Sequence, residues 1–263
     1  MEFQRRHPFE TIIAVPLEEY VLHATEFEFR HRFWLILLTY FAGFLCYRFD
    51  HQNVADALAR WIFGNRDPHL QALAARGLLV LSAALVAVAA GIRTWAGAYL
   101  RADVVFDTKV HSDRLVADGP YRHLRNPLYL GNLIVAAGIA MLFSRIGATV
   151  LLLGNLLIIL RLIGREQAAL VASQGDSYRA FLEAVPKLWP SLSPRLPSGG
   201  MTPRWRQAFL GELHLWILAA DGFILPWRMD RLLYYRILAI AGISYFLMRT
   251  TMRLARTRAP RNL

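Results

Sequence analysis

Apolar runs of membrane length constrain this chain more than any other feature of its sequence. They cover residues 33–49, 77–99, 128–144, 146–163, 208–226 and 231–248. A helix needs about 20 apolar residues to cross a hydrocarbon layer of roughly 30 Å. Hydrophobic residues make up 56% of the 263, and the mean hydropathy is +0.32, which excludes a soluble globular domain. We therefore predict an all-α integral membrane bundle of about six transmembrane helices, with additional cytosolic amphipathic helices.

The charge of the chain indicates how such a bundle is oriented. Its net charge is +11, which in a soluble protein would favour nucleic acid as a partner. Here the basic residues flank the apolar runs, where they set topology and meet anionic head groups. With both termini inside, the inner segments hold about 21 Lys and Arg and the outer segments about 7. The expected partner is the lipid bilayer, both termini are expected in the cytoplasm, and no nucleic acid partner is expected.

Three parts are expected along the chain. They are an N-terminal arm with the first span and an interfacial helix (1–76), a core (77–195), and a C-terminal transmembrane hairpin with a basic tail (196–263). In the first part, apolar residues recur at helical spacing from Asn53 to Trp61. This pattern predicts an amphipathic helix that lies at the membrane interface.

Polar side chains gather at both ends of a predicted helical hairpin over residues 128–163. Gly119–Gly131 leads into its first helix, and a second cluster from Arg161 to Gln167 closes its second helix. Because the hairpin folds back on itself, we expect the two clusters to meet. Pro127 fits the first turn of a helix, and Gly131 allows close backbone approach. A helix N-terminus rimmed with arginine favours a carboxylate or phosphate ligand.

Several common site types are missing from the sequence. It has no Gly-x-Gly-x-x-Gly fingerprint, no Walker A sequence, no His-Glu-x-x-His pair and no nucleophile elbow. The one cysteine, Cys46, excludes an internal disulfide and a multi-cysteine zinc site. The histidines show no ligand spacing, so no metal is expected. A nucleotide-like cofactor would therefore need a site built from helix ends.

The order of several motifs is more specific than any one of them. The series is Arg93-Thr-Trp-Ala, then Asp113 to Gly131 with Gly-Pro-Tyr-Arg-His-Leu-Arg-Asn-Pro-Leu-Tyr-Leu-Gly, then Glu166-Gln-x-x-Leu170, Gly175-x-x-Tyr178 and Val185-Pro186 to Pro190. Over residues 88–190 this series resembles the isoprenylcysteine carboxyl methyltransferase and phospholipid methyltransferase superfamily. Asn126 stands where eukaryotic members usually have histidine and resembles the version in bacterial members. Gln167 replaces a second glutamate. A bacterial inner membrane is therefore the expected location.

The resemblance implies an S-adenosylmethionine-dependent methyltransferase that acts on a lipid-like or lipid-attached acceptor. In that superfamily, S-adenosylmethionine binds at the cytosolic end of the helical hairpin, between the two motif groups. Carried onto this chain, the implied cofactor-binding residues are Tyr121, Arg125, Asn126, Pro127, Tyr129, Gly131, Arg161, Glu166, Gln167 and Tyr178. The residues implied for the reaction itself are Arg125, Glu166 and His123.

The chemistry of this cofactor gives each residue type a role. Arg125 or Arg161 can hold its carboxylate, and Glu166 can meet its ammonium or ribose. Tyr129 or Tyr178 can pack on the adenine or the sulfonium. A carboxylate acceptor needs no general base, whereas an amine acceptor must lose a proton, for which His123 is suited.

Each assignment has a structural alternative. Arg122 and Arg125 can serve as membrane-interface anchors. Glu166 can be a solvated charge at a helix end, and His123 can be an exposed or interface-facing residue. Tyr178 can simply pack in a core.

Two other functions stay open at the level of sequence. Membrane sterol and steroid reductases share an Arg-His-Pro-like motif with this superfamily but use NADPH. The Glu166-x-x-x-Leu170 series and the lack of their extended C-terminal signature weigh against that function. A non-catalytic membrane protein that keeps the fold is the second alternative, motivated by Asn126 and Gln167. The acceptor, the role of residues 208–248 and the oligomeric state are not encoded in recognisable motifs.

Overall fold

The computed structural model describes residues 23–64, 67–100 and 117–228, together with Ile243, Phe246 and Thr250. The described part is helical, and it contains no strand beyond one isolated bridge between Asn53 and Ser144. This confirms the all-α fold class. The arm before residue 23 lies outside the described residues, as do the expected span 231–248 and the basic tail apart from Ile243, Phe246 and Thr250.

Two helices are long and apolar enough to cross a membrane. They are α5 (Pro68–Tyr99) and α8 (Arg145–Gln174), with 32 and 30 residues. A third candidate is the pair α10 (Trp205–Gly211) and α11 (Leu213–Arg228), which is bent by 61° and passes the same test only if it counts as one span. The described residues therefore hold two or three candidate spans, so the expected number of about six is not confirmed.

Two of the expected spans are shorter than the sequence pattern indicated. The run 33–49 forms α3 (Arg32–Leu45), of 14 residues, which tightens into the 3-10 helix η1 (Cys46–Arg48). The run 128–144 forms α7 (Pro127–Ala140), also of 14 residues. In both, the last apolar residues belong to turns that reverse the chain, which a hydropathy pattern cannot distinguish from a continuing helix.

The helix ends follow from local side-chain chemistry. Asp67 caps α5 by accepting hydrogen bonds from the backbone N–H groups of His69 and Leu70, ahead of Pro68 at the first turn. Ser144 caps α8 by accepting from the Gly147 N–H at 3.1 Å. At its other end α8 runs on to Gly175, whose φ of +59° favours glycine. The helix therefore passes through Glu166 without a break.

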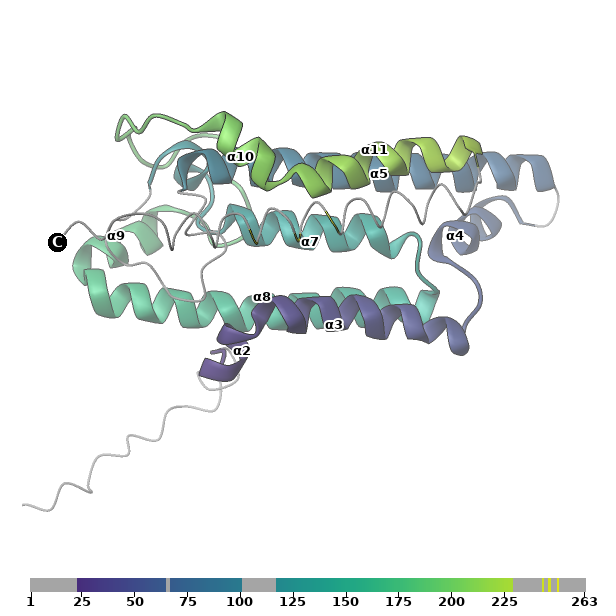
Figure 1. Ribbon diagram of the computed structural model, residues 1–263, viewed down its shortest axis with the longest axis horizontal. Coiled ribbons are helices and arrows are strands. Elements are labelled where there is room, and N and C mark those ends of the chain that lie inside the picture. The colour runs from purple at the N-terminus through teal and green to yellow at the C-terminus, as the bar shows by residue number, and fades with distance from the viewer. Residues whose placement is uncertain are drawn as a thin grey trace, which may run out of the picture.

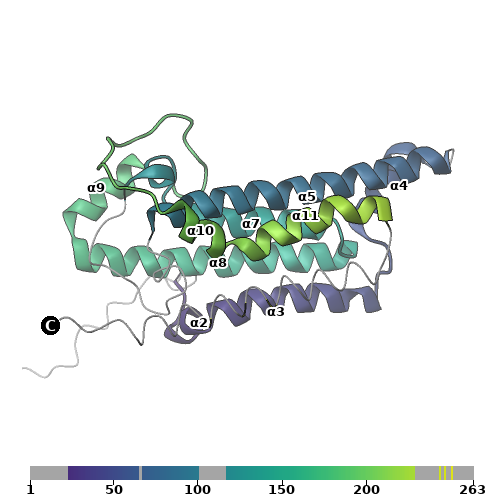
Figure 2. The ribbon, with the colours of Figure 1, turned by 45° about the horizontal axis from the view of Figure 1, so that its top comes forward.

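The helices lie side by side along the long axis of the molecule (Figure 1). Helix α7 packs between α5 and α8, while α11 covers α5 and α3 covers α8. The turned view in Figure 2 shows the same arrangement. Small residues allow the close approach, since Ala89 and Ala90 of α5 and Ala136 of α7 are fully buried.

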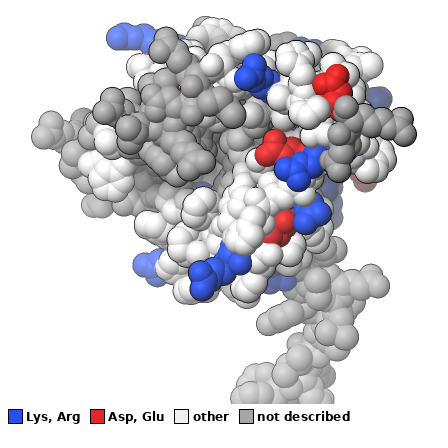
Figure 3. Space-filling view, turned by 90° about the vertical axis from the view of Figure 1, so that its right-hand side faces the viewer, with Lys and Arg blue, Asp and Glu red and all other residues white. Residues whose placement is uncertain are grey.

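A short amphipathic helix lies at one end of the bundle, as the spacing predicted. It is α4 (Val54–Phe63), which buries Ala55 and Ala59 and leaves Trp61 82% exposed. Asn53 caps it by accepting from the Asp56 N–H at 2.7 Å. Figure 3 looks onto this end of the molecule and shows acidic side chains beside basic ones.

Towards the opposite end, α2 (Glu26–Arg30) packs on α8, η2 (Gly119–Arg122) precedes the start of α7, and α9 (Asp176–Ala184) follows the end of α8. A chain segment of residues 186–204, here named the strap, follows α9 and leads to α10. This end holds both polar clusters that the sequence singled out.

Candidate functional site

The Gly119–Gly131 motif forms η2, a short loop and the first turn of α7. Gly119 has a φ of +55°, and a Cβ built on it would lie 2.3 Å from the Tyr99 ring, so glycine is required there. Pro127 is fully buried at the first position of α7. The motif therefore fixes where α7 begins, against the end of α5.

A hydrogen bond joins the two ends of the helical hairpin. Tyr129, in the first turn of α7, donates its hydroxyl to the Glu166 carboxylate at 2.8 Å. Glu166 lies eight residues before the end of α8 and is partly buried. It is therefore not a solvated charge at a helix end, and the meeting of the two clusters expected from the hairpin is confirmed.

Three buried polar atoms of the same two motif groups have no hydrogen-bond partner among the described residues. They are the Tyr121 hydroxyl, the Arg125 Nε and the Gln167 Nε2. An unpaired buried polar group costs about 1–3 kcal/mol. All three can donate a hydrogen bond, so together they favour a ligand rich in oxygen acceptors.

Arg125 interacts electrostatically with a second cation, Lys187, and with the phenol of Tyr178. Burial lowers the pKa of Arg125, which the neighbouring Tyr178 raises in part. Burial and the nearby Arg125 guanidinium both lower the pKa of Lys187. Two close cations without a carboxylate between them make a position where an anion is favourable.

Tyr178 is buried and belongs to the packing of α9. It forms a cluster with Phe181 and Val185, and burial raises its pKa to about 12. The packing role that sequence offered as an alternative is therefore present. Because the Tyr178 hydroxyl also interacts electrostatically with Arg125, that role does not remove it from the site.

Other residues expected at the site are engaged elsewhere. Arg161 makes a bidentate ion pair with Glu28, at 3.0 and 2.8 Å. Asn126 donates its amide to the backbone carbonyl of Lys187 at 2.9 Å. The space above Gly131 is filled by the Arg93 side chain, because a Cβ there would lie 2.4 Å from Arg93 Cγ.

His123 is held by the strap. Its Nδ1 lies 2.8 Å from the Ser191 carbonyl oxygen, and the Ser191 N–H donates back to the His123 carbonyl at 2.9 Å. Since a carbonyl only accepts, Nδ1 carries the proton, and a neutral ring leaves Nε2 as its acceptor. His123 is therefore half-buried and positioned by the strap, and it is not an exposed residue.

The strap is tied to the motif along its whole length. The Arg125 N–H donates to the Pro186 carbonyl, and Arg122 Nε donates to the Leu196 carbonyl at 2.7 Å. Asp118 accepts from the Ser198 hydroxyl and from the N–H groups of Gly199 and Met201. These bonds, led by that from Met201, lower the pKa of Asp118.

One buried polar network was not anticipated from sequence. Arg93 makes a bidentate ion pair with Glu212, at 2.8 and 2.9 Å, and donates to Asn132 at 2.6 Å. The sequence analysis expected basic residues beside the apolar runs to meet lipid head groups, but Arg93 is instead bonded to Glu212 and Asn132 inside the bundle. The usable signal was a charged residue in each of two apolar runs, at positions 93 and 212.

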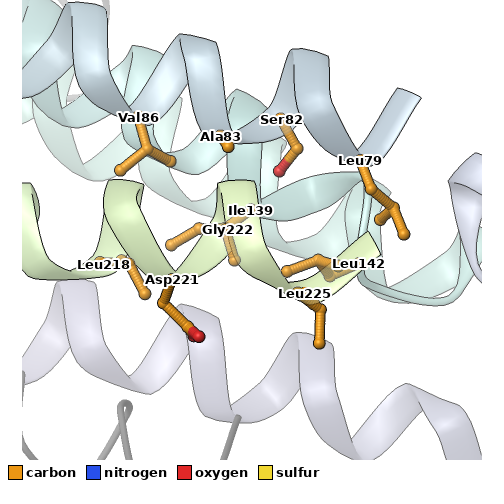
Figure 4. A pocket seen from close by; sticks show the side chains of 10 residues that line it. All are labelled: Leu79, Ser82, Ala83, Val86, Ile139, Leu142, Leu218, Asp221, Gly222 and Leu225. Carbon is orange, nitrogen blue, oxygen red and sulfur yellow. The ribbon is translucent and has the colours of Figure 1, made fainter. Parts of the chain in front are cut away.

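A small apolar cavity lies away from this cluster, between α5, α7 and α11 (Figure 4). Its volume is about 20 Å³, enough for a single water molecule. Asp221 borders it, although its carboxylate points away from Ser82 and Ala83 of α5. A cofactor does not fit there.

Comparison with known proteins supports the resemblance in the same region. Residues 78–174 match the sequence profile of the phospholipid methyltransferase family. This confirms the expected resemblance over α5, the motif and the hairpin, and it supports a membrane methyltransferase. No curated protein and no solved structure gave a significant match.

Proposed function

We propose that this chain is an integral membrane S-adenosylmethionine-dependent methyltransferase that acts on a lipid-like or lipid-attached acceptor. The observation that carries the proposal is the Tyr129–Glu166 hydrogen bond, together with three buried donors of the same motifs that have no partner among the described residues. These groups lie within the region that matches the phospholipid methyltransferase profile. The reductase alternative is not favoured by that match.

The residues present fit S-adenosylmethionine, which supplies a methyl group on a sulfonium when bound. Arg125 and Lys187 would take its carboxylate, because an anion between them offsets the repulsion by which Arg125 lowers the pKa of Lys187. Arg161, the other candidate for this role, is already paired with Glu28 through its guanidinium. The proposal therefore assigns the carboxylate to Arg125.

Glu166 and Gln167 would bind the remaining polar groups of the cofactor. Glu166 keeps acceptor capacity beyond its bond to Tyr129 and can take an ammonium or a ribose hydroxyl. The unpartnered Gln167 amide can donate to ribose oxygens. Methyl transfer is an in-line displacement, so the contribution of these residues is chiefly positioning.

The chemistry of the acceptor decides whether a base is needed. A carboxylate acceptor attacks as it stands, whereas an amine acceptor must first lose a proton. His123 Nε2 is the ring atom left to accept that proton, because Nδ1 is held by Ser191. The distribution of Lys and Arg favours the cytoplasmic face for this site, and the resemblance of Asn126 to bacterial members favours a bacterial inner membrane.

Titration of the purified chain with S-adenosylmethionine tests the proposal. We expect binding by the unmutated protein, and a loss of about 10–100-fold in affinity for Arg125→Ala and for Glu166→Ala, since charge-assisted hydrogen bonds contribute about 1.5–3 kcal/mol. Arg179→Ala and Glu183→Ala are matched controls, because both side chains are exposed on α9. Absence of binding by the unmutated protein would remove the proposal.

A second measurement separates catalysis from mere cofactor binding. Labelled S-adenosylmethionine is incubated with membranes, and the label is followed into lipid and protein fractions. Label in a lipid-like or lipid-attached product supports the methyltransferase. Cofactor binding without transfer to any acceptor favours the non-catalytic alternative, and binding of NADPH in place of S-adenosylmethionine favours the reductase.

A further inference from the structure

An open groove at the start of α10 carries charge that the proposed reaction does not use. It is lined by Pro203, Arg204, Trp205, Arg206, Gln207 and Leu210. The Arg204 N–H donates to the Ala98 carbonyl at 2.8 Å, and Ala208 packs on Gly97. The groove is therefore fixed beside the last turn of α5, near the end of the bundle that holds the candidate site (Figure 1).

Among the described residues, no acidic side chain pairs with the basic charge of this groove. The sequence from 184 to 211 contains Lys187, Arg195, Arg204 and Arg206 but no Asp or Glu. Arg204 and Arg206 are exposed, and within the described ranges neither makes an ion pair. At the opposite end of the bundle, by contrast, the exposed Arg145 is paired with Asp50.

Exposed apolar side chains lie next to this charge. Trp205, Phe209 and Leu210 of α10 are 50%, 44% and 40% exposed. A partner that suits the surface must therefore offer both an anion and hydrocarbon. A free phosphate supplies only the anion, whereas tryptophan and arginine together are typical of the level where acyl chains meet head groups.

We infer that the Arg204–Leu210 groove binds an anionic phospholipid, with its phosphate on Arg204 and Arg206 and its acyl chain against Phe209 and Leu210. Arginine suits this partner because its planar donors match phosphate oxygens in pairs. The lipid is a bound neighbour of the enzyme and not its methyl acceptor. The inference holds whether or not the chain transfers methyl groups.

Native mass spectrometry of the full chain, released from mixed bilayers of phosphatidylglycerol and phosphatidylcholine with identical acyl chains, tests the inference. We expect the unmutated protein to retain phosphatidylglycerol preferentially. An arginine near an anionic membrane contributes about 1 kcal/mol, so Arg204→Gln and Arg206→Gln should each weaken retention about 5-fold, and together about 30-fold. Arg204→Lys/Arg206→Lys should keep most of the preference.

The matched control is Arg60→Gln/Arg179→Gln, which removes two exposed charges elsewhere and should leave the preference unchanged. If the control and Arg204→Gln/Arg206→Gln lose the preference for phosphatidylglycerol equally, the effect comes from net charge alone and the proposed site is overturned. Unchanged retention in Arg204→Gln/Arg206→Gln would overturn it directly. Displacement of phosphatidylglycerol by inorganic phosphate alone would show a free-anion site and would also overturn it. The lysine variants keep the test valid if the glutamine variants unfold.

Discussion

At the scale of single residues, Gly131 is the position where the structure most changes the interpretation of the motif. Its missing side chain makes room for Arg93 Cγ and Cδ, which a Cβ would approach to 2.4 and 2.9 Å. The Arg93 head group cannot move away cheaply, because Glu212 and Asn132 hold it. We therefore expect Gly131→Ala to lower the free energy of unfolding by about 1–3 kcal/mol, measured by thermal unfolding in a mild detergent.

Gly91→Ala is the matched control for this prediction. Gly91 also lies inside a long helix, but nothing would lie within 4 Å of a Cβ added there. That variant should be neutral or more stable by up to about 1 kcal/mol, since alanine favours helix more than glycine does. Equal unfolding temperatures for the two variants would contradict the steric role of Gly131.

Single residues also show which contacts of the candidate site could be predicted from the sequence. The motif order and the folding back of the hairpin were enough to predict that Glu166 would lie near the first turn of α7. The partners of Arg161 and Arg93 were not predictable, because Glu28 and Glu212 are more than 100 positions distant along the chain. Ion pairs over such separations depend on tertiary packing, which local patterns do not encode.

At the scale of helices, the Arg93–Glu212 pair joins α5, α7 and the bend between α10 and α11. Its side chains are 10% and 4% exposed, so removing one partner leaves a buried charge. We expect Glu212→Gln to cost about 3–5 kcal/mol of stability, and the double variant Arg93→Met/Glu212→Leu to be less destabilised than Glu212→Gln. Thermal unfolding of the purified variants checks both.

The exposed pair Arg179–Asp176 serves as the comparison, at 65% and 97% exposure. Asp176→Asn should cost less than about 1 kcal/mol. A loss for Glu212→Gln no larger than this would mean that the buried pair does not hold the three helices together.

The short helix α2 should detach from α8 in acid. The Arg161 guanidinium beside Glu28 holds the pKa of that carboxyl at about 2, below its usual 4.5. Because the pKa is lowered in the folded state, the stabilisation is complete above about pH 4.5 and is lost as the pH falls towards 2. Hydrogen exchange of residues 24–30 between pH 6 and pH 3 should show the loss.

Glu28→Gln isolates this ion pair from other carboxyl groups. The variant should already exchange faster at pH 6 and should depend less on pH across the same window. If unmutated protein and variant lose protection in parallel, some other group controls the attachment of α2.

The sequence predicted the kind of each secondary-structure element better than its bounds. The amphipathic α4, the hairpin of α7 and α8 and the first turn at Pro127 follow local rules for spacing, capping and proline. The unbroken passage of α8 through Glu166 to Gln174 was missed, because polar residues after Gly164 look like the start of a new element. In this stretch Glu166 bonds Tyr129 of α7 and Arg165 pairs with Glu26 of α2, contacts that the local sequence does not encode.

At the scale of the whole molecule, the arrangement of helices makes the predicted topology testable. Ser177 on α9 and His69 at the start of α5 are exposed and lie at opposite ends of the bundle. With the native cysteine replaced by Cys46→Ser, we expect a membrane-impermeant maleimide to label His69→Cys in intact cells. Ser177→Cys should react only in inverted vesicles. The reverse pattern would place the candidate site on the outer face.

If α7 crosses the bilayer, its shortness links the candidate site to the thickness of the hydrocarbon layer. Its 14 residues span about 21 Å, well under the roughly 30 Å of an average hydrocarbon layer, whereas the 30 residues of α8 span about 45 Å. Tyr129 and Glu166 are hydrogen-bonded, so the depth of the site is tied to the tip of the shorter helix. Each ångström of mismatch then carries a cost that thinning of the bilayer around α7 relieves. In that case, we expect the chain length of the surrounding lipids to alter the position of the Tyr129–Glu166 pair relative to the membrane surface.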